Sequence, residues 1–258
     1  MRVPVVQHRS RRRRALGRRA LWTGGEFLVT AGVVLLLLVV HQLWWTNREA
    51  RQGAEHQVQA LERQWATPGA VSGSTPSANT GLAGGSSPRR STSADGSTTV
   101  TGSAAGPRRS QAYAILTIPR LHLRVPVAEG VSKRNVLNKG YVGHYPGTQQ
   151  PGQAGNFALA GHRNTHGEPF RYLPRLRLKD TVRVETSAAT YTYTVDKILP
   201  QTSAADSGVI RPIPRSTVKP AYGYSSAGYY VTLTTCTPEF TSRYRMVVWG
   251  TLTSTHLR

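Results

Sequence analysis

The chain has 258 residues and a formal net charge of +21, from 33 lysine and arginine residues against 12 acidic ones. Such a charge attracts anionic surfaces, but it does not distinguish nucleic acid from anionic lipid head groups or the acidic polymers of a bacterial envelope. The single cysteine excludes a disulfide within the chain, and in an exported protein a lone thiol is either reactive or intermolecular.

The N-terminal part carries an arginine block followed by a long apolar run. Eight arginines lie within residues 2–19, and residues 27–45 contain no Asp, Glu, Lys or Arg. As a helix, 27–45 would be about 28 Å long at about 1.5 Å per residue, close to the hydrocarbon thickness of about 30 Å. Because clustered arginines stay on the cytoplasmic side, we predict a cytoplasmic segment at 1–26, one transmembrane anchor at 27–45 and an extracellular remainder.

Two other interpretations of this region are weaker. A cleaved signal peptide would have small residues after the apolar run, whereas the sequence there is His-Gln-Leu-Trp-Trp. A nuclear-localisation or nucleic-acid function for the arginine block is disfavoured by the apolar run directly behind it. We therefore predict a retained single-pass anchor in the cell membrane and no nucleic-acid partner.

Two segments separate the predicted anchor from the main domain. Residues 46–66 are polar, with Val58, Leu61 and Trp65 spaced three and four apart, which indicates a short juxtamembrane helix. Residues 67–110 consist largely of Gly, Ser, Thr, Ala and Pro. This composition predicts a flexible linker with a typical reach of about 35 Å.

Residues 111–258 have the length of one domain and hold most of the aromatic and β-branched side chains. Short extended runs separated by glycine- and proline-containing turns favour a mostly β domain, either a closed barrel or a sandwich. Weak helical patterns occur at 133–137 and 169–173. The expected strands are 114–118, 123–127, 156–160, 181–185, 190–198, 229–235 and 246–253.

Cys236 directly follows the strand predicted at 229–235. Side chains of a strand alternate between its two faces, so Cys236 shares the more polar face with Thr232 and Thr234. Pro238 ends the strand just beyond the thiol, and strand ends are where a rigid scaffold presents catalytic groups. In an arbitrary protein a lone cysteine is more often a small buried residue. Here its position and the nearby cationic side chains favour a nucleophile.

A cysteine nucleophile needs a base or a positive neighbour, because the thiolate is the reactive form and a free thiol has a pKa of about 8.5. The predicted domain contains five histidines. His162 follows the strand predicted at 156–160, so its position at a strand end matches that of Cys236, and we expect both at one rim. The other four are His122, His144, His166 and His256.

Two arginines, Arg243 and Arg245, lie where the strand predicted at 246–253 begins. A guanidinium does not act as a base, but it donates hydrogen bonds to a developing oxyanion. Strand alternation places residues two apart on the same face, so it does not choose between the two arginines. Solvated surface charges are the other interpretation of this pair.

The sequence shows no sign of a bound cofactor. The carboxylates of the domain are scattered, and none accompanies a cysteine or histidine at metal-ligand spacing. The Ala-Gly-Gly at 83–85 lies in the predicted linker and follows no strand, so it does not form a phosphate loop. We predict neither a metal nor an organic cofactor.

These motifs resemble the sortase family of cysteine transpeptidases. Residues 232–238 (TLTTCTP) and 245–248 (RMVV) are similar to the family's TLxTC strand and to the arginine that opens its next strand, and 160–163 (AGHR) looks like its histidine segment. The likeness covers roughly 114–253. It implies an eight-stranded sortase β-barrel with Cys236 as nucleophile, His162 as acid/base, and Arg245 rather than Arg243 as oxyanion stabiliser.

The Thr-Thr-Cys-Thr-Pro sequence and the basic N-terminal tail resemble class E, the housekeeping sortases of high-GC Gram-positive bacteria. Class C enzymes share Thr-Cys-Thr-Pro but often carry a lid and a C-terminal span, and the sequence shows neither. The resemblance implies cleavage of an LPXTG-like sorting motif, LAXTG for class E, between Thr and Gly. The surface protein would then be joined to an amine of a peptidoglycan precursor through a thioacyl-enzyme.

Two rival functions stay open at this point. A hydrolytic cysteine peptidase would use the same three residues with water as acceptor, since the choice of acceptor depends on how well water is excluded. A non-enzymatic, anchored wall-binding protein would use its charge to bind anionic polymer and leave Cys236 inert.

Overall fold

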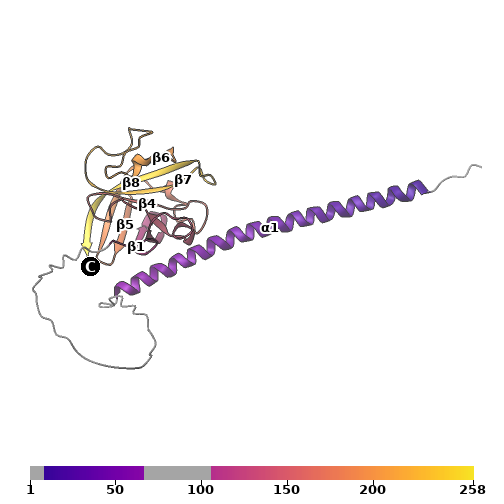
Figure 1. The fold of residues 1–258 in the computed structure, drawn as a ribbon, viewed down its shortest axis with the longest axis horizontal. Helices are drawn as coiled ribbons and strands as arrows, with labels where there is room; N and C mark the ends of the chain where they lie inside the picture. Colours follow the sequence, from indigo (N-terminus) through magenta and orange to yellow (C-terminus); the bar gives the residue numbers. More distant parts are fainter. Residues whose placement is uncertain (1–8, 67–105) are drawn as a thin grey trace, which may run out of the picture.

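The computed structural model describes residues 9–66 and 106–258 of the chain (Figure 1). The first eight residues of the predicted cytoplasmic segment and most of the predicted linker, 67–105, lie outside the described residues. The described part consists of one long helix, α1 (Arg9–Ala66), and a compact β domain.

Eight strands form a closed barrel in the order β1-β2-β3-β4-β7-β8-β6-β5, which confirms the predicted eight-stranded β-barrel. Seven of the strands match the extended runs expected from the sequence. The eighth, β3, has three residues, too few for a visible alternation. The strands are β1 (Ala112–Ile118), β2 (Leu123–Glu129), β3 (Val142–His144), β4 (Gly155–Ala160), β5 (Thr181–Thr186), β6 (Ala189–Ser203), β7 (Tyr229–Thr237) and β8 (Tyr244–Leu257).

The helical patterns expected at 133–137 and 169–173 form turns instead. Each pattern ends in a short 3-10 helix rather than an α-helix. Gly140, with a positive φ of 78°, ends the first segment, and Pro174 restricts the second. The 3-10 helices are η1 (Pro119–Leu121), η2 (Leu137–Lys139), η3 (Leu173–Arg175) and η4 (Ser207–Ile210).

Strand alternation in β7 separates the two sides of the barrel wall. Val231 and Leu233 point into the main apolar core, whereas Thr232 lies on the outer face, which η4 covers. The indole N–H of Trp249 donates to the carbonyl of Val209 over 3.1 Å on this outer face. Because the period is two residues, Cys236 also lies on the outer face, near the end of β7.

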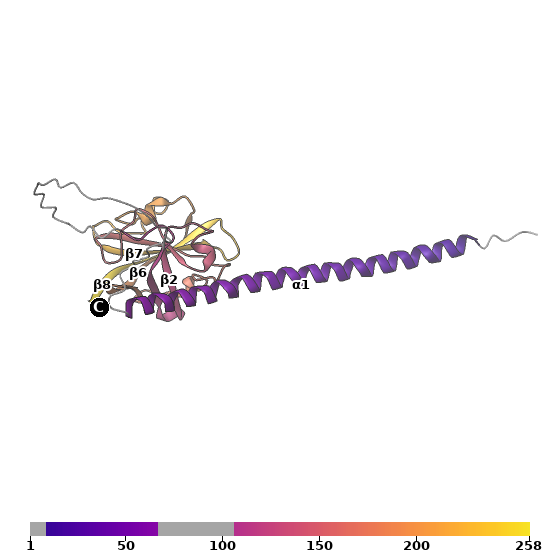
Figure 2. The ribbon, with the colours of Figure 1, turned by 60° about the horizontal axis from the view of Figure 1, so that its bottom comes forward.

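The second half of α1 packs against the outside of the barrel, next to β1, β2 and η2. Its buried side chains recur at a helical spacing of three and four residues: Ala50, Ala54, Val58 and Leu61. Glu62 of α1 accepts a hydrogen bond from Arg124 of β2 over 2.6 Å. Figure 2 shows α1 passing along the barrel and projecting far beyond it.

The projecting half of α1 exposes its apolar side chains, and the segment Gly24–Ala66 is long and apolar enough to cross a membrane. The helix continues without a break from this apolar stretch to the part that packs on the barrel. Trp65, near the end of α1, and Ala112, at the start of β1, both pack against the buried cluster of Val58, Leu61 and Ile115. The end of α1 is therefore anchored beside β1, and α1 itself sets the distance between the barrel and the apolar segment.

Candidate active site

Strands β4 and β7 run parallel as neighbours, with Ala160 paired to Thr234. His162 and Cys236 each come two residues after this pair in the chain. The carboxyl ends of parallel neighbours meet at one edge of a sheet, so the two side chains emerge at the same rim, as their positions at strand ends predicted.

Hydrogen bonds to neighbouring segments fix the end of β7. The hydroxyl of Thr235 donates to the carbonyl of Gly161 over 2.9 Å. The guanidinium of Arg163 donates to the carbonyl of Cys236 (3.2 Å) and to the hydroxyl of Thr237 (3.0 Å). The thiol, which is partly exposed, thus lies on a backbone tied to the loop that carries His162.

His162 is held by Asn138, which follows β2 in a different loop. The two side chains form a hydrogen bond of 2.9 Å between Nε2 of His162 and Oδ1 of Asn138. Because an amide oxygen only accepts, this bond places a proton on Nε2 and leaves Nδ1 as the basic nitrogen. Burial, followed by the nearby His166 and Lys133, lowers the pKa of His162 to about 4.

Arg245 pairs directly with Cys236 in the antiparallel ladder of β7 and β8. Its Nη1 donates to two backbone carbonyls, those of Ser242 (2.8 Å) and Tyr244 (3.0 Å), which fixes the plane of the guanidinium. Arg243 is exposed, with its guanidinium 5.3 Å from the ring centroid of Tyr244. Within the described residues, no hydrogen bond joins the thiol of Cys236 to either His162 or Arg245.

A cleft of about 760 Å³ brings these groups together, and its walls come from four parts of the chain. They are the loop after β4, the adjoining ends of β7 and β8 with the loop between them, α1, and Lys133 between β2 and η2. Cys236, His162 and Arg245 all line it, whereas Arg243 is not among the described residues that do. The other lining residues are Trp44, Thr46, Asn47, Lys133, Arg163, Asn164, Thr165, His166, Glu168, Phe240, Thr241 and Ser242.

The other predicted histidine candidates differ in their surroundings. His166 lines the cleft, with its ring stacked on that of His162 at 5.4 Å between centroids. His144 is 1% exposed and bonds to Glu129 over 2.6 Å, so it is a structural residue of the barrel wall. His122 ends η1 and His256 lies near the end of β8, and neither lines the cleft. Among the described residues, no group of three or more His, Cys, Asp and Glu side chains is placed to hold a metal ion.

Comparison with known proteins agrees with this architecture. A model of the sortase domain matches residues 116–253, more than half of the chain. The chain belongs to the sortase family. Sortase SrtE1 of Streptomyces coelicolor is 41% identical over 231 residues, which cover 88% of this chain and 55% of that protein. Sortase SrtE2 of the same organism is 33% identical, over 90% of this chain and 81% of that protein. The chain thus spans about half the length of sortase SrtE1.

Solved sortase structures share the fold of the barrel. The crystal structure of sortase E1 from Streptomyces coelicolor with a tripeptide in the active site is 48% identical, with a TM-score of 0.55 over 58% of this chain and 92% of that chain. Sortase E from Streptomyces avermitilis is 39% identical, with a TM-score of 0.52 over 58% of this chain and 93% of that chain. Both matches cover little more than the sortase barrel of this chain.

Sequence reasoning did not find several residues that shape this sortase site. Arg163 is next to His162 in the sequence, so its contact with the Cys236 strand could have been suspected from the histidine motif. The sequence did not indicate a role for Asn138, because it is a single polar residue between two strands and belongs to no motif. Asn47 and Glu168 meet across 121 positions of sequence, and no local pattern predicts that contact.

Proposed function

We propose that the chain is a membrane-anchored class E sortase that transfers a sorting-motif protein to an amine through a thioacyl-enzyme. The observation that carries this proposal is the single cleft lined by Cys236, His162 and Arg245. These side chains supply a nucleophile, a proton-transfer group and an oxyanion donor, which are the parts that acyl transfer needs.

In the first half-reaction, Nδ1 of His162 takes the proton of the Cys236 thiol as the sulfur attacks the carbonyl carbon of the Thr-Gly bond. A C–S bond forms, and the carbonyl oxygen becomes an oxyanion that accepts hydrogen bonds from Arg245. The C–N bond then breaks, and the imidazolium of His162 gives its proton to the leaving amine. A thioester between the threonine carbonyl and Cys236 remains.

In the second half-reaction, an amine of a cell-wall precursor attacks the thioester. His162 takes a proton from the attacking nitrogen and gives it to the departing thiolate of Cys236. The products are an amide bond between the surface protein and the precursor, and a regenerated thiol. No net oxidation or reduction occurs: the original thiol proton leaves on the amine released in the first half-reaction, and the regenerated thiol carries a proton from the acceptor amine.

The environment of His162 suits a base that starts neutral. Since burial, with the nearby His166 and Lys133, lowers its pKa to about 4, the imidazole is uncharged near pH 7, which is the protonation state that a general base needs. Arg245 is suited to its role because two of its five N–H donors are bound to Ser242 and Tyr244 carbonyls. The donors on Nε and Nη2 are then held in a fixed plane for the oxyanion, which is the preorganisation that oxyanion stabilisation requires.

The length and apolar character of α1 support the proposed location. Residues 27–45 would cross the cell membrane as a single span, with the arginine block in the cytoplasm and the barrel outside the cell. In this orientation the cleft faces the compartment where surface proteins and peptidoglycan precursors are found. We propose LAXTG-type sorting motifs as substrates and a precursor amine as acceptor.

The experiment is a product analysis with the full chain in detergent micelles. LPXTG and LAXTG peptides are incubated with and without an amine acceptor such as triglycine, and ligated and hydrolysed products are quantified. Ligated product that rises with the acceptor concentration is expected. Hydrolysed product alone at every acceptor concentration would favour the hydrolytic peptidase. Absence of both products, with a Cys236 alkylation rate like that of a free thiol, would favour the wall-binding protein.

A further inference from the structure

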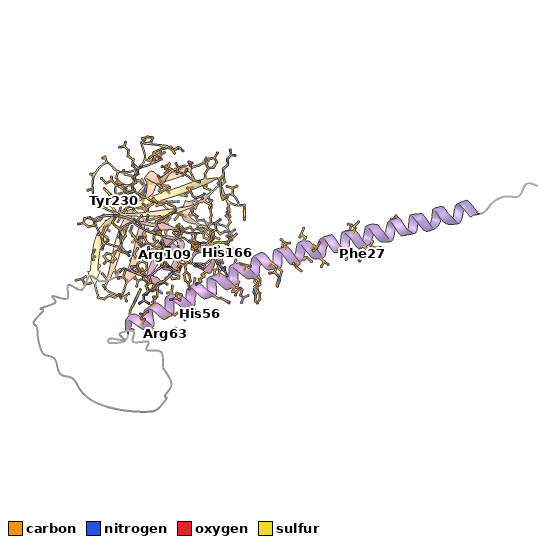
Figure 3. The ribbon with its side chains drawn as sticks, viewed as in Figure 1. Phe27, His56, Arg63, Arg109, His166 and Tyr230 are labelled. Carbon is orange, nitrogen blue, oxygen red and sulfur yellow. The ribbon has the colours of Figure 1, made fainter. Side chains whose placement is uncertain are left out.

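The helix α1 forms part of the cleft that holds Cys236. Trp44, Thr46 and Asn47 lie at the end of the apolar stretch, and all three line the cleft. Figure 3 places His166 beside α1, while Phe27 lies far along the same helix, away from the barrel. One continuous helix thus joins the membrane-spanning segment to the wall of the proposed active site.

Two side chains of α1 form hydrogen bonds with the loop that carries His162. Asn47 donates to the Glu168 carboxylate over 2.9 Å and accepts from the backbone N–H of Gly167 over 3.2 Å. Arg51 donates to the carbonyl of Gly167 over 3.1 Å and to Glu168 over 2.9 Å. Both polar groups of the Gly167 backbone, and both carboxylate oxygens of Glu168, are therefore bound by one turn of α1.

Glu168 lies at the centre of this contact and is only 6% exposed. Besides the two residues of α1, it accepts from Arg171 over 2.7 Å. Arg171 in turn lies 3.5 Å from the carboxylate of Glu239 in the β7–β8 loop. A buried carboxylate needs cationic partners and hydrogen bonds, and α1 supplies one of the two arginines and two of the three hydrogen bonds named here.

The loop backbone at this point is in a conformation that it would not adopt readily on its own. His166, Gly167 and Glu168 have φ values of 52°, 83° and 54°, all in the left-handed region. Two of these three residues carry a Cβ atom and are disfavoured there. Such a conformation persists where its surroundings determine it, and here Asn47 and Arg51 bind two of the three residues, Gly167 and Glu168.

The same turn of α1 also supports the second loop that positions His162. Ala50 packs against Gly140, where an added Cβ would lie 2.6 Å from the carbonyl oxygen of Ala50. Gly140 follows η2, which contains Asn138, the hydrogen-bond partner of His162. The turn of α1 at 47–51 therefore contacts both segments that position the imidazole of His162, namely 166–168 and the loop that contains Asn138 and Gly140.

We propose that Asn47 and Arg51 are positioning residues for His162, so that the sortase is fully active only while α1 is docked on the barrel. They do not touch the reacting atoms. They act by holding the 166–168 backbone, and with it the orientation of the imidazole relative to Cys236. This inference rests on the proposed function for its kinetic readout, but a second readout is independent of it.

The test compares Asn47→Ala with Glu62→Gln in the full chain in detergent micelles. Asn47→Ala removes both of its hydrogen bonds without changing the charge, whereas Glu62→Gln removes the ion pair from a contact of α1 with β2 that is remote from both loops around His162. Because displacement of a catalytic group by about 1 Å can lower a rate by about 100-fold, we expect Asn47→Ala to lower kcat by roughly 10- to 100-fold with little change in KM. Glu62→Gln should leave both constants near those of the parent enzyme.

The second readout is the alkylation rate of Cys236 with iodoacetamide, which needs no peptide substrate. Cys236 is the one cysteine of the chain, so alkylation reports on it alone. If His162 acts on the thiol, Asn47→Ala should slow alkylation toward the rate of His162→Ala. If the parent protein turns over no peptide, the proposed function fails while this measurement still tests the inference.

Double variants decide whether the effect passes through His162. Residues that act as one unit are non-additive, so Asn47→Ala should cause no further loss in a His162→Ala background. A second loss of the same size there would overturn the proposal. It would also be overturned if Asn47→Ala, Arg51→Met and Ala50→Leu, which forces α1 away from Gly140, all kept parent-like kcat and alkylation rates.

Discussion

Cys236 and Arg245 are directly opposite each other in the antiparallel ladder of β7 and β8, so their side chains leave the same outer face of the barrel. Arg243 precedes β8, and its guanidinium lies near the ring of Tyr244. The sequence left the two arginines equivalent except for their place in a motif. The structure adds that Arg245 lines the cleft with the thiol and that two backbone carbonyls hold its guanidinium.

We therefore expect Arg245→Ala to lower kcat and kcat/KM together, by roughly 100- to 1000-fold, because an oxyanion donor acts mainly in the transition state. Arg245→Lys should restore little, since an ammonium lacks the planar fork that both bonds Ser242 and Tyr244 and reaches an oxyanion. Arg243→Ala is the matched control and should cost much less. Steady-state kinetics of the three variants with a sorting peptide checks this, and a larger loss at Arg243 than at Arg245 would reverse the assignment.

His162→Ala should lower kcat/KM by roughly 100- to 10,000-fold, as expected for a general acid–base group that acts in both half-reactions. His166 is the fair comparison, because it lines the same cleft and stacks on His162. His166→Gln should keep most of the activity. If His166→Gln loses this much kcat/KM and His162→Ala does not, the roles of the two histidines must be exchanged. His144→Ala is a poor control, since it removes a buried hydrogen-bonded side chain and should mainly lower stability.

The acid limb of the pH profile of kcat/KM, where activity falls on acidification, should lie at low pH. The neutral imidazole of His162 is the form that accepts the thiol proton, and burial lowers its pKa to about 4 from an ordinary value of about 6.5. Activity should therefore persist as the pH falls through 6.5 and should be lost only as the pH approaches 4. Lys133→Met removes a positive charge that disfavours protonation of His162, so it should move this limb to higher pH. Peptide cleavage by the full chain between pH 4 and 8 checks both expectations, and a limb at or above 6.5 in the parent enzyme would contradict them.

Asn138→Asp should also move the acid limb of kcat/KM toward neutral pH. A carboxylate in place of the amide oxygen would accept the bond from Nε2 of His162 and stabilise the imidazolium, and an opposite charge this close typically shifts a pKa by about 1–3 units. Asn138→Leu keeps a similar size but removes the hydrogen bond. It should lower kcat without shifting the limb upward. Equal pH profiles for the parent enzyme and Asn138→Asp would show that Asn138 does not act on His162.

Much of the fold could be predicted because its signals are local. Alternating apolar residues identified seven of the eight strands, and the position of Cys236 and His162 at strand ends predicted one rim. The parallel pairing of β4 with β7, which brings the rim together, is a long-range contact that alternation alone does not specify. The family resemblance supplied the closed barrel that residue patterns had left as one of two possibilities.

The part of the site that the sequence did not predict depends on α1. Spacing of Val58, Leu61 and Trp65 indicated a helix, but a helix pattern does not say what its apolar face packs against. Docking of that face on the barrel brings Asn47 to Glu168, and it places Trp44 in the wall of the cleft. The composition of the predicted linker carries no information on this docking, which depends on contacts of α1 with β1, β2 and η2.

The most direct test of the account is mass spectrometry of the full chain after incubation with an LAXTG or LPXTG peptide and no amine acceptor. Attack of the thiol on the Thr-Gly bond should add the mass of the peptide up to its threonine to the protein, on the tryptic fragment that contains Cys236. Cys236→Ala should carry no adduct, should turn over no peptide and should keep the circular dichroism spectrum of the parent protein. Turnover of the peptide by well-folded Cys236→Ala, or an adduct on any other residue, would contradict the central claim that Cys236 is the nucleophile.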